Sequence, residues 1–150
     1  MAAVSNPETA RFLNEYLADL SVLYQKLRSF HWNVEGPAFF TLHAKTEEYY
    51  DEVAEEIDDV AERILMIGSR PVSTLKEYLE RASLKEAPAK VYRAEEIVGH
   101  LVDDFSTLVE ALHRGIAVAE KEGDPGTVDL LTGSLQRYEK ELWMLKAFSA

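Results

Sequence analysis

Apolar residues recur along most of the chain at spacings of three and four positions, which is the pattern of helices with one buried face. Proline and glycine interrupt this pattern at only a few places. The interruptions divide the chain into four predicted helices, which run from the stretch SNPET to about Gly36, from about Pro37 to Gly68, from about Ala94 to Glu122, and from Asp124 to the C-terminus. No segment alternates with the period of a β-strand.

The predicted helix ends carry the expected capping residues. Ser5 or Asn6 can cap the first helix before Pro7, and Asp124 can cap the last helix before Pro125. Both prolines suit a first helical turn, because the nitrogen of that turn has no helical hydrogen-bond partner to lose. These signals favour helices that start close to the positions set by the apolar pattern.

The connections between the helices predict their arrangement. Short turns join the first helix to the second and the third to the fourth, whereas about 25 residues separate the second from the third. Within that long connection the stretch STLKEYLERAS has a serine cap and the apolar spacing of a short helix. We therefore predict an all-α protein, a ferritin-like four-helix bundle with a short extra helix in the crossover, as a single domain over residues 1–150.

Composition narrows the possible partners. The chain is 47% hydrophobic and has no apolar run of the length that spans a membrane, and its start lacks the pattern of a signal peptide, so we expect a cytoplasmic protein. It has no cysteine, so any metal must be held by His, Asp or Glu. A formal net charge of -11 disfavours nucleic acid and anionic membrane and favours cations.

The second predicted helix carries a polar stripe beside its apolar one. The apolar stripe consists of Leu42, Tyr49, Val53, Ile57, Val60, Ile64 and Ile67. The polar stripe holds His43 with Glu47 and Asp58 with Glu62, each pair four residues apart, which is the spacing that lets two side chains share a metal ion. Asp58 follows His43 by 15 residues, or about 22 Å along a helix, so one ion cannot take both pairs from one chain.

The end of the first predicted helix can meet the start of the second. The Gly36-Pro37 turn folds one helix back on the other and brings His31 close to His43. Carboxylates for a complete site would then come from the second helix of another subunit, which a two-fold axis can supply. Trp32 points away from the apolar stripe of its own helix, which favours burial against that other subunit.

Two other interpretations compete with this composite site. Each candidate ligand taken alone is an ordinary core or surface residue, and Asp59 with Arg63 could be a plain surface ion pair. Glu110 and His113 have the Glu-x-x-His spacing of ferritin-like di-iron sites inside a bundle. Both of these residues point away from the apolar stripe, however, and no second Glu-x-x-His occurs in the chain, so we disfavour this second site.

The stretch KLRSFHWNVEGPAFFTLHAKTEEYYDEVAEEIDDVAERILMIG, with STLKEYLE and the last helix, closely resembles the Dps family of mini-ferritins. The resemblance covers nearly the whole chain. It implies a hollow homododecamer that oxidises Fe(II), preferably with hydrogen peroxide rather than dioxygen, and stores ferric iron. It also implies ferroxidase ligands at His31 and His43 from one subunit and at Asp58 and Glu62 from its partner, with Trp32 beside them. Glu47 stands where the family usually has Asp, so occupancy by two irons is open.

The resemblance also bears on iron entry and on DNA. It implies an acidic pore at a three-fold axis, which Glu120, Asp124 and Asp129 could line, although Asp124 is equally explained as a helix cap. Many members of the family bind DNA through a lysine-rich N-terminal tail. The first eleven residues of this chain hold a single basic residue, Arg11, so the alternative function of DNA binding and compaction is disfavoured.

Overall fold

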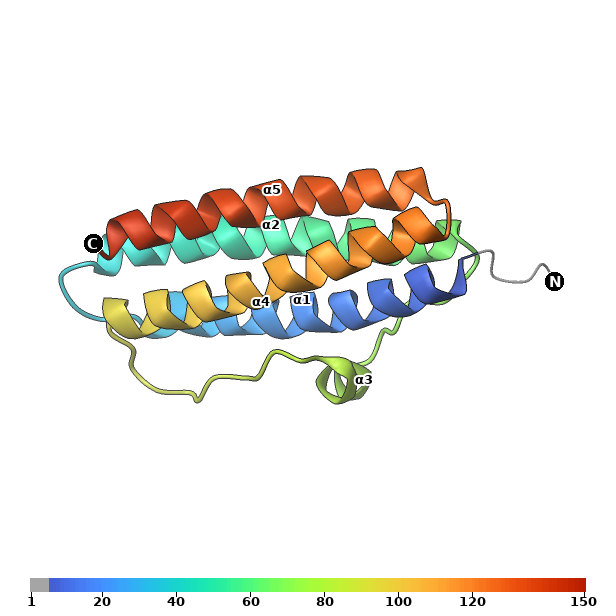
Figure 1. Ribbon diagram of the computed structural model, residues 1–150. Helices are drawn as coiled ribbons and strands as arrows, with labels where there is room; N and C mark the ends of the chain where they lie inside the picture. The colour runs from blue at the N-terminus through green and yellow to red at the C-terminus, as the bar shows by residue number, and fades with distance from the viewer. Residues whose placement is uncertain (1–5) are drawn as a thin grey trace.

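The computed structural model describes residues 6–150 and contains five α-helices. They are α1 (Pro7–Asn33), α2 (Phe39–Met66), α3 (Leu75–Arg81), α4 (Ala94–Lys121) and α5 (Pro125–Phe148). Four of them form the long helices of a bundle and the short α3 lies in the crossover between α2 and α4 (Figure 1). The predicted ferritin-like bundle with an extra crossover helix is confirmed, and the predicted boundaries agree to within a few residues.

The helices pair in the order that the short turns predict. α1 packs along α2, α4 packs along α5, and α1 also contacts α4 and the crossover helix α3 (Figure 1). The crossover runs along the side of the bundle, and its last part forms a single parallel β-bridge between Tyr92 and Val34. This bridge lies at the end of the bundle that holds the turn between α1 and α2.

The apolar stripes of the four long helices meet in one core. Leu42, Tyr49, Val53, Val60, Ile64 and Ile67 of the predicted stripe are buried. Ile57 is the exception, because it is only partly buried and borders a groove between α1 and the crossover. The rest of the interior is filled by buried leucines and Phe30 of α1, by leucines and Phe105 of α4, and by leucines and Tyr138 of α5.

A buried carboxylate in the bundle interior accepts hydrogen bonds from three side chains. Glu56 of α2 accepts hydrogen bonds from the hydroxyls of Tyr16 and Tyr138 and from the guanidinium of Arg137. The Tyr138 hydroxyl lies 2.6 Å from Glu56 Oε1. Because three protein donors already compensate for its burial, this carboxylate is explained without a metal ion.

Polar residues of α1 hold the crossover against the bundle. The Asp19 carboxylate accepts hydrogen bonds from the backbone N–H groups of Ser83 and Leu84, and the Asn14 side chain bonds to Val72 and Arg70. These groups are buried, so they need such partners. The apolar pattern of α1 gave no indication of this second function of the helix.

The helix caps differ in part from the prediction. Asp124 caps α5 by accepting the N–H of Thr127, as predicted. Asn6 occupies the N-cap position of α1 but makes no side-chain capping bond, and Ser5 lies outside the described residues. The carboxylate of Glu122, from the end of α4, accepts the N–H groups of Glu8 and Thr9 instead. In the part of the chain described, every helix is too short or too polar to cross a membrane.

Candidate metal centre

His31 near the end of α1 and His43 in the first turns of α2 lie against each other, as the turn between the helices predicts. Their imidazole rings stack with centroids 3.7 Å apart and planes inclined by 16°. His31 is buried and His43 is half-buried. The Gly36 backbone has a φ of 119°, which is accessible to glycine and lets the chain reverse within the few residues between the helices.

Reciprocal hydrogen bonds fix both imidazoles. Nδ1 of His31 lies 2.6 Å from the backbone oxygen of His43, and Nδ1 of His43 lies 2.8 Å from the backbone oxygen of His31. A carbonyl oxygen only accepts, so each Nδ1 must carry the proton and donate it. In the neutral imidazole each Nε2 then keeps its lone pair, which is the arrangement found in metal-binding histidines whose other nitrogen is held by a carbonyl.

A carboxylate and two aromatic rings surround the histidine pair. Glu47 Oε1 lies 3.8 Å from Nε2 of His31 and 3.4 Å from the hydroxyl of Tyr50. The Tyr50 ring meets the His31 ring edge to face at 5.3 Å, and Phe39 stacks on His43 at 4.9 Å. Tyr50 and Phe39 were not among the predicted site residues, although their positions three or four residues from Glu47 and His43 on α2 could have indicated them.

Trp32 lies beside the pair and faces solvent, as its position on the helical wheel predicts. Its side chain is 57% exposed, which is unusual for a tryptophan. The guanidinium of Arg28 lies 5.0 Å from the centre of the Trp32 ring and 5.3 Å from that of Tyr24. A large exposed aromatic ring held by a neighbouring cation fits a surface that is covered in an assembly.

Asp58 and Glu62 lie farther along α2 and are exposed. A hydrogen bond with Asp58, together with the repulsion between the two carboxylates, raises the pKa of Glu62 above its ordinary value. The two acids are therefore neighbours whose negative charges repel each other, and a bound cation would relieve that repulsion. Within residues 6–150, no group of three or more His, Asp or Glu side chains is gathered closely enough to hold a metal ion.

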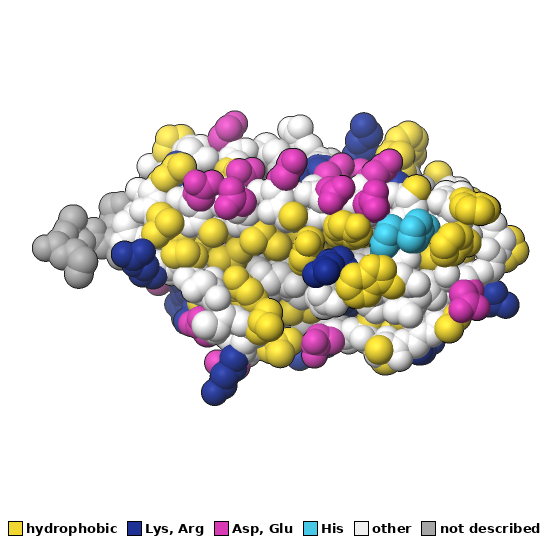
Figure 2. Space-filling view, turned by 180° about the vertical axis from the view of Figure 1, so that it is seen from behind, with side chains coloured by type: hydrophobic (Ala, Val, Ile, Leu, Met, Phe, Trp, Pro, Cys, Tyr) yellow, Lys and Arg dark blue, Asp and Glu magenta, His cyan; other side chains and the backbone are white. Residues whose placement is uncertain are grey.

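The histidines and the acids share one face of the molecule. Figure 2 shows this face, on which acidic side chains form a row above an apolar band and histidine side chains lie beside one end of that row. α2 contributes Asp51, Glu55, Asp58, Asp59 and Glu62 to its exposed surface, and none of these five has an ion-pair partner among residues 6–150. The face thus carries a histidine pair and, apart from it, a row of acidic side chains that have no ion-pair partner within residues 6–150.

The competing interpretations gain no support from the geometry. Glu110 and His113 are both exposed on α4, as their wheel positions predict. Arg63 does not pair with Asp59, because its guanidinium lies 2.6 Å from Asp124 and also donates to the hydroxyl of Thr127. The surface ion pair considered from the sequence is therefore wrong.

The acids predicted to line a pore differ in their surroundings. Asp124 is buried and accepts hydrogen bonds from Arg63 and Thr127. Burial alone would raise the pKa of Asp124, but these hydrogen bonds outweigh that effect and lower it. Glu120 and Asp129 are exposed near the corner between α4 and α5 and are free to attract cations. The role of these acids in a pore stays a prediction.

Comparison with known proteins places this arrangement in a family. Residues 10–150 match the Ferritin-like domain. "DNA protection during starvation protein 2" of Bacillus anthracis is 48% identical over 143 residues, which cover 95% of this chain and 97% of that protein. The crystal structure of a Dps protein from Bacillus brevis is 45% identical, covers 100% of both chains and superposes with a TM-score of 0.95.

The description of a third similar structure includes a wider superfamily. The Dps protein of Vibrio cholerae O1 is 36% identical, with 97% of this chain and 91% of that chain covered and a TM-score of 0.94, and its structure is described as a member of a broad superfamily of ferritin-like diiron-carboxylate proteins. The predicted family is therefore confirmed, and this chain belongs to the Dps family of ferritin-like proteins.

Proposed function

We propose that this Dps protein is a ferroxidase and an iron-storage protein, for which Fe(II) is both substrate and cargo. The observation that carries the proposal is the fixed histidine pair. His31 and His43 each present an Nε2 lone pair because their Nδ1 atoms donate to backbone oxygens. Imidazole and carboxylate ligands suit ferrous iron, and the diiron-carboxylate superfamily of a close structural relative is consistent with it.

The ligand set becomes complete when two chains meet. His31 and His43 of one protomer bind Fe(II) on one side, and Asp58 and Glu62 of the other protomer bind it from the opposite side. A two-fold axis produces two such sites at each interface, since each chain gives both halves. Glu47 lies 3.8 Å from His31 and is the carboxylate best located to bind a second ferrous ion.

The chemistry requires the site to hold iron in an open coordination sphere that hydrogen peroxide can reach. Two ferrous ions reduce one peroxide in the overall reaction, and with two protons this yields two ferric ions and two water molecules, so no hydroxyl radical is released. The exposed acids and Tyr50 beside Glu47 can hold protons near the reacting oxygen atoms. Dioxygen is the slower alternative oxidant in this proposal.

Trp32 acts as a protective residue in the same proposal. If a site holds one iron, peroxide cleavage needs a second electron from elsewhere, and the exposed indole of Trp32, next to His31 in the sequence, or the nearby Tyr50 can supply it. Trp32 then donates that electron and is itself oxidised, which keeps the radical within the protein.

The same family supports a proposal for the assembly. Twelve chains enclose a cavity in which ferric mineral collects, and Glu120 and Asp129 draw Fe(II) toward an entry pore by their charge. Asp124, whose carboxylate is held by Arg63, shapes the start of α5 next to that entry. The protein would act in the cytoplasm and would protect DNA by removing iron and peroxide, without direct contact with DNA.

The experiment that tests the proposal compares two histidine variants. His31→Gly/His43→Gly should assemble normally but lose rapid oxidation of Fe(II) by anaerobically added peroxide and should retain little soluble iron. His113→Gly is the matched control, because it removes an exposed histidine from α4. The proposal fails if the double variant assembles and stores iron as fast as the unmodified protein.

A further inference from the structure

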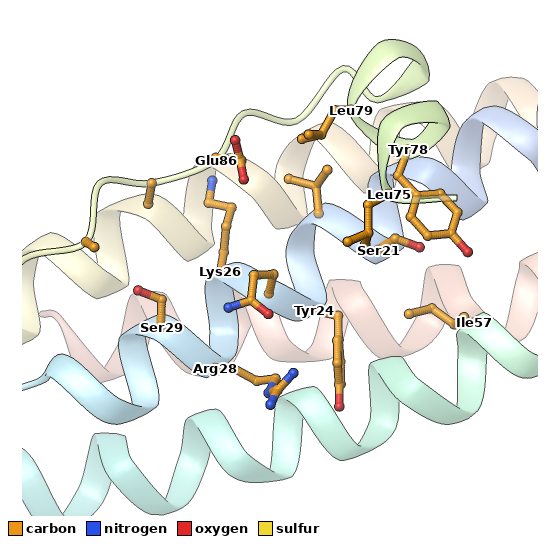
Figure 3. Close-up of a pocket in the computed structure, with 14 residues that line it drawn as sticks. Ser21, Tyr24, Lys26, Arg28, Ser29, Ile57, Leu75, Tyr78, Leu79 and Glu86 are labelled. Atoms are coloured by element: carbon orange, nitrogen blue, oxygen red, sulfur yellow. The ribbon is translucent and has the colours of Figure 1, made fainter. Parts of the chain in front are cut away.

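The crossover follows α1 toward the histidine pair. Figure 3 shows the chain leaving α3 and running over α1, where Glu86 of the crossover and Lys26 of α1 line the same groove. Farther along, Tyr92 forms the β-bridge with Val34, the residue that follows α1. The crossover therefore reaches the chain only three residues after His31.

The bridge changes the partner of one backbone N–H at the end of α1. The last helical bond runs from the N–H of Val34 to the oxygen of Phe30, at 3.1 Å. If the helix continued, the N–H of Glu35 would bond to the oxygen of His31, four residues before it. Instead it donates to the backbone oxygen of Tyr92 at 2.9 Å. The carbonyl of His31 is thus left without that helical donor.

The carbonyl of His31 is also the group that fixes His43. Nδ1 of His43 lies 2.8 Å from the oxygen of His31 and donates its proton to it, which leaves Nε2 of His43 free for a metal ion. A carbonyl that already accepts a helical N–H would bind this side-chain donor more weakly. In water a neutral imidazole prefers to carry its proton on Nε2, so a weaker bond would favour the tautomer whose Nε2 cannot bind a metal.

Tyr92 can accept the N–H of Glu35 because its own position is fixed. Its side chain is fully buried, and its ring meets the Phe30 ring edge to face with centroids 4.9 Å apart. Its hydroxyl donates to the backbone oxygen of Pro88, and its N–H donates to the backbone oxygen of Asn33 at 3.0 Å. These contacts hold the backbone of Tyr92 against the end of α1.

We propose that Tyr92 is a positioning residue of the metal centre: its backbone oxygen takes up the N–H of Glu35 and so leaves the carbonyl of His31 free to hold His43 in its metal-binding tautomer. This inference rests on the proposed function, because it concerns the histidine pair as a metal site. Tyr92 acts through the backbone of α1 and is not itself a ligand.

The tautomer of His43 tests this role in the assembled protein without iron. Solid-state NMR of protein labelled with ¹⁵N-histidine shows which nitrogen carries the proton at about pH 8, above the ordinary pKa of histidine. A His43→Gln variant identifies the signal. The unmodified protein should carry the proton on Nδ1, whereas Tyr92→Ala should move most of it to Nε2. Tyr92→Ala should also weaken Zn(II) binding, measured by calorimetry, by about tenfold or more.

Two variants serve as matched controls for the loss of the tyrosine. Tyr92→Phe keeps the ring on Phe30, and Val91→Ala shortens the neighbouring side chain, which is exposed. Both should keep the proton of His43 on Nδ1 and the affinity for Zn(II) of the unmodified protein.

Removing the donor separates this role from simple support of the fold. Glu35→Pro deletes the N–H at an exposed position, and the extended backbone of Val34, with a ψ of 137°, suits a residue before proline. With no N–H left to compete for the His31 carbonyl, Glu35→Pro should keep the Nδ1 proton of His43. Added to Tyr92→Ala, it should restore both the tautomer and the affinity for Zn(II), which would not follow if the lost ring acted only by weakening the core.

The inference is overturned if His43 of the unmodified protein carries its proton on Nε2, if Tyr92→Ala leaves the proton on Nδ1, or if the double variant recovers nothing. Should Tyr92→Ala fail to assemble, Glu35→Pro alone decides: a kept Nδ1 proton supports the inference and a lost one overturns it. Failure of the ferroxidase proposal is a separate result, in which the tautomer responds as expected but the unmodified protein oxidises no iron.

Discussion

Two backbone carbonyls determine which nitrogen of each histidine carries a proton. Each carbonyl belongs to the other histidine, so His31 and His43 hold each other in the tautomer that a metal needs. Each ring is also supported from the side, His31 by Tyr50 and His43 by Phe39. The pair is therefore oriented before any iron arrives, and binding needs little further ordering of these side chains.

The role of Trp32 leads to a prediction at this scale. Trp32→Phe should leave assembly and the rate of iron oxidation nearly unchanged, because the indole provides no metal ligand. It should increase the hydroxyl radical that escapes into solution several-fold when iron is limiting, since phenylalanine is much harder to oxidise. Spin trapping with peroxide and less than one Fe(II) per site measures this, and Arg11→Gln serves as a surface control. Equal radical leakage from the variant and the unmodified protein would remove Trp32 from the mechanism.

The sequence predicts which histidines lie together better than it predicts the hydrogen bonds and ring contacts that they make. Helical spacing and the Gly36-Pro37 turn are enough to bring His31 and His43 together, because both depend on backbone geometry. The reciprocal Nδ1 bonds and the contact with Tyr50 depend on side-chain rotamers, which spacing does not specify. For the same reason the sequence missed that Arg63 pairs with Asp124, a residue 61 positions away, instead of with nearby Asp59.

The helix α1 makes different contacts on different sides. α1 buries an apolar stripe in the bundle, holds the crossover with Asn14 and Asp19, and carries His31 of the histidine pair near its end. The spacing of apolar residues predicts the buried stripe of α1. It does not predict the contacts of Asn14 and Asp19 with the crossover, because in a sequence buried polar residues look like ordinary surface positions. The crossover helix was predicted as a helix, but its lack of any buried side chain was visible only in three dimensions.

Glycines of the long helices give a prediction at the scale of the element. A Cβ added at Gly115 of α4 would overlap the ring of Phe12 on α1, whereas a Cβ at Gly133 of α5 would have no neighbour within 4 Å. Gly115→Ala should cost about 1–3 kcal/mol of unfolding free energy through the clash. Gly133→Ala should add about 0.5–1 kcal/mol, since alanine is the better helix former.

Thermal unfolding at one fixed protein concentration compares these two variants directly. The midpoint should fall for Gly115→Ala and rise for Gly133→Ala. Adding Phe12→Leu to Gly115→Ala should recover part of the loss, because the shorter side chain relieves the overlap. If Gly115→Ala is as stable as the unmodified protein, the close packing of α1 on α4 at this point is not a constraint.

At the scale of the whole molecule, the proposed site requires two chains, because each chain supplies only one half of it. His43 lies near the start of α2 with His31 of α1 against it, and the acid pair lies too far along α2 for one ion to bind both groups in a single chain. In the proposed two-fold dimer, the histidines of each chain meet the acid pair of the other chain, which gives two sites. Iron oxidation would therefore depend on assembly. In this proposal a free chain lacks a complete site, so it should not oxidise iron rapidly until two chains associate.

Complementation between two defective chains tests this central claim most directly. One chain carries His31→Gly/His43→Gly and the other carries Asp58→Asn/Glu62→Gln, so neither should oxidise iron rapidly by itself. When both are co-expressed in equal amounts, half of the dimers are mixed and one of their two sites is intact, which predicts recovery of about a quarter of the unmodified activity. No recovery in co-assembled protein would contradict a site shared between two chains.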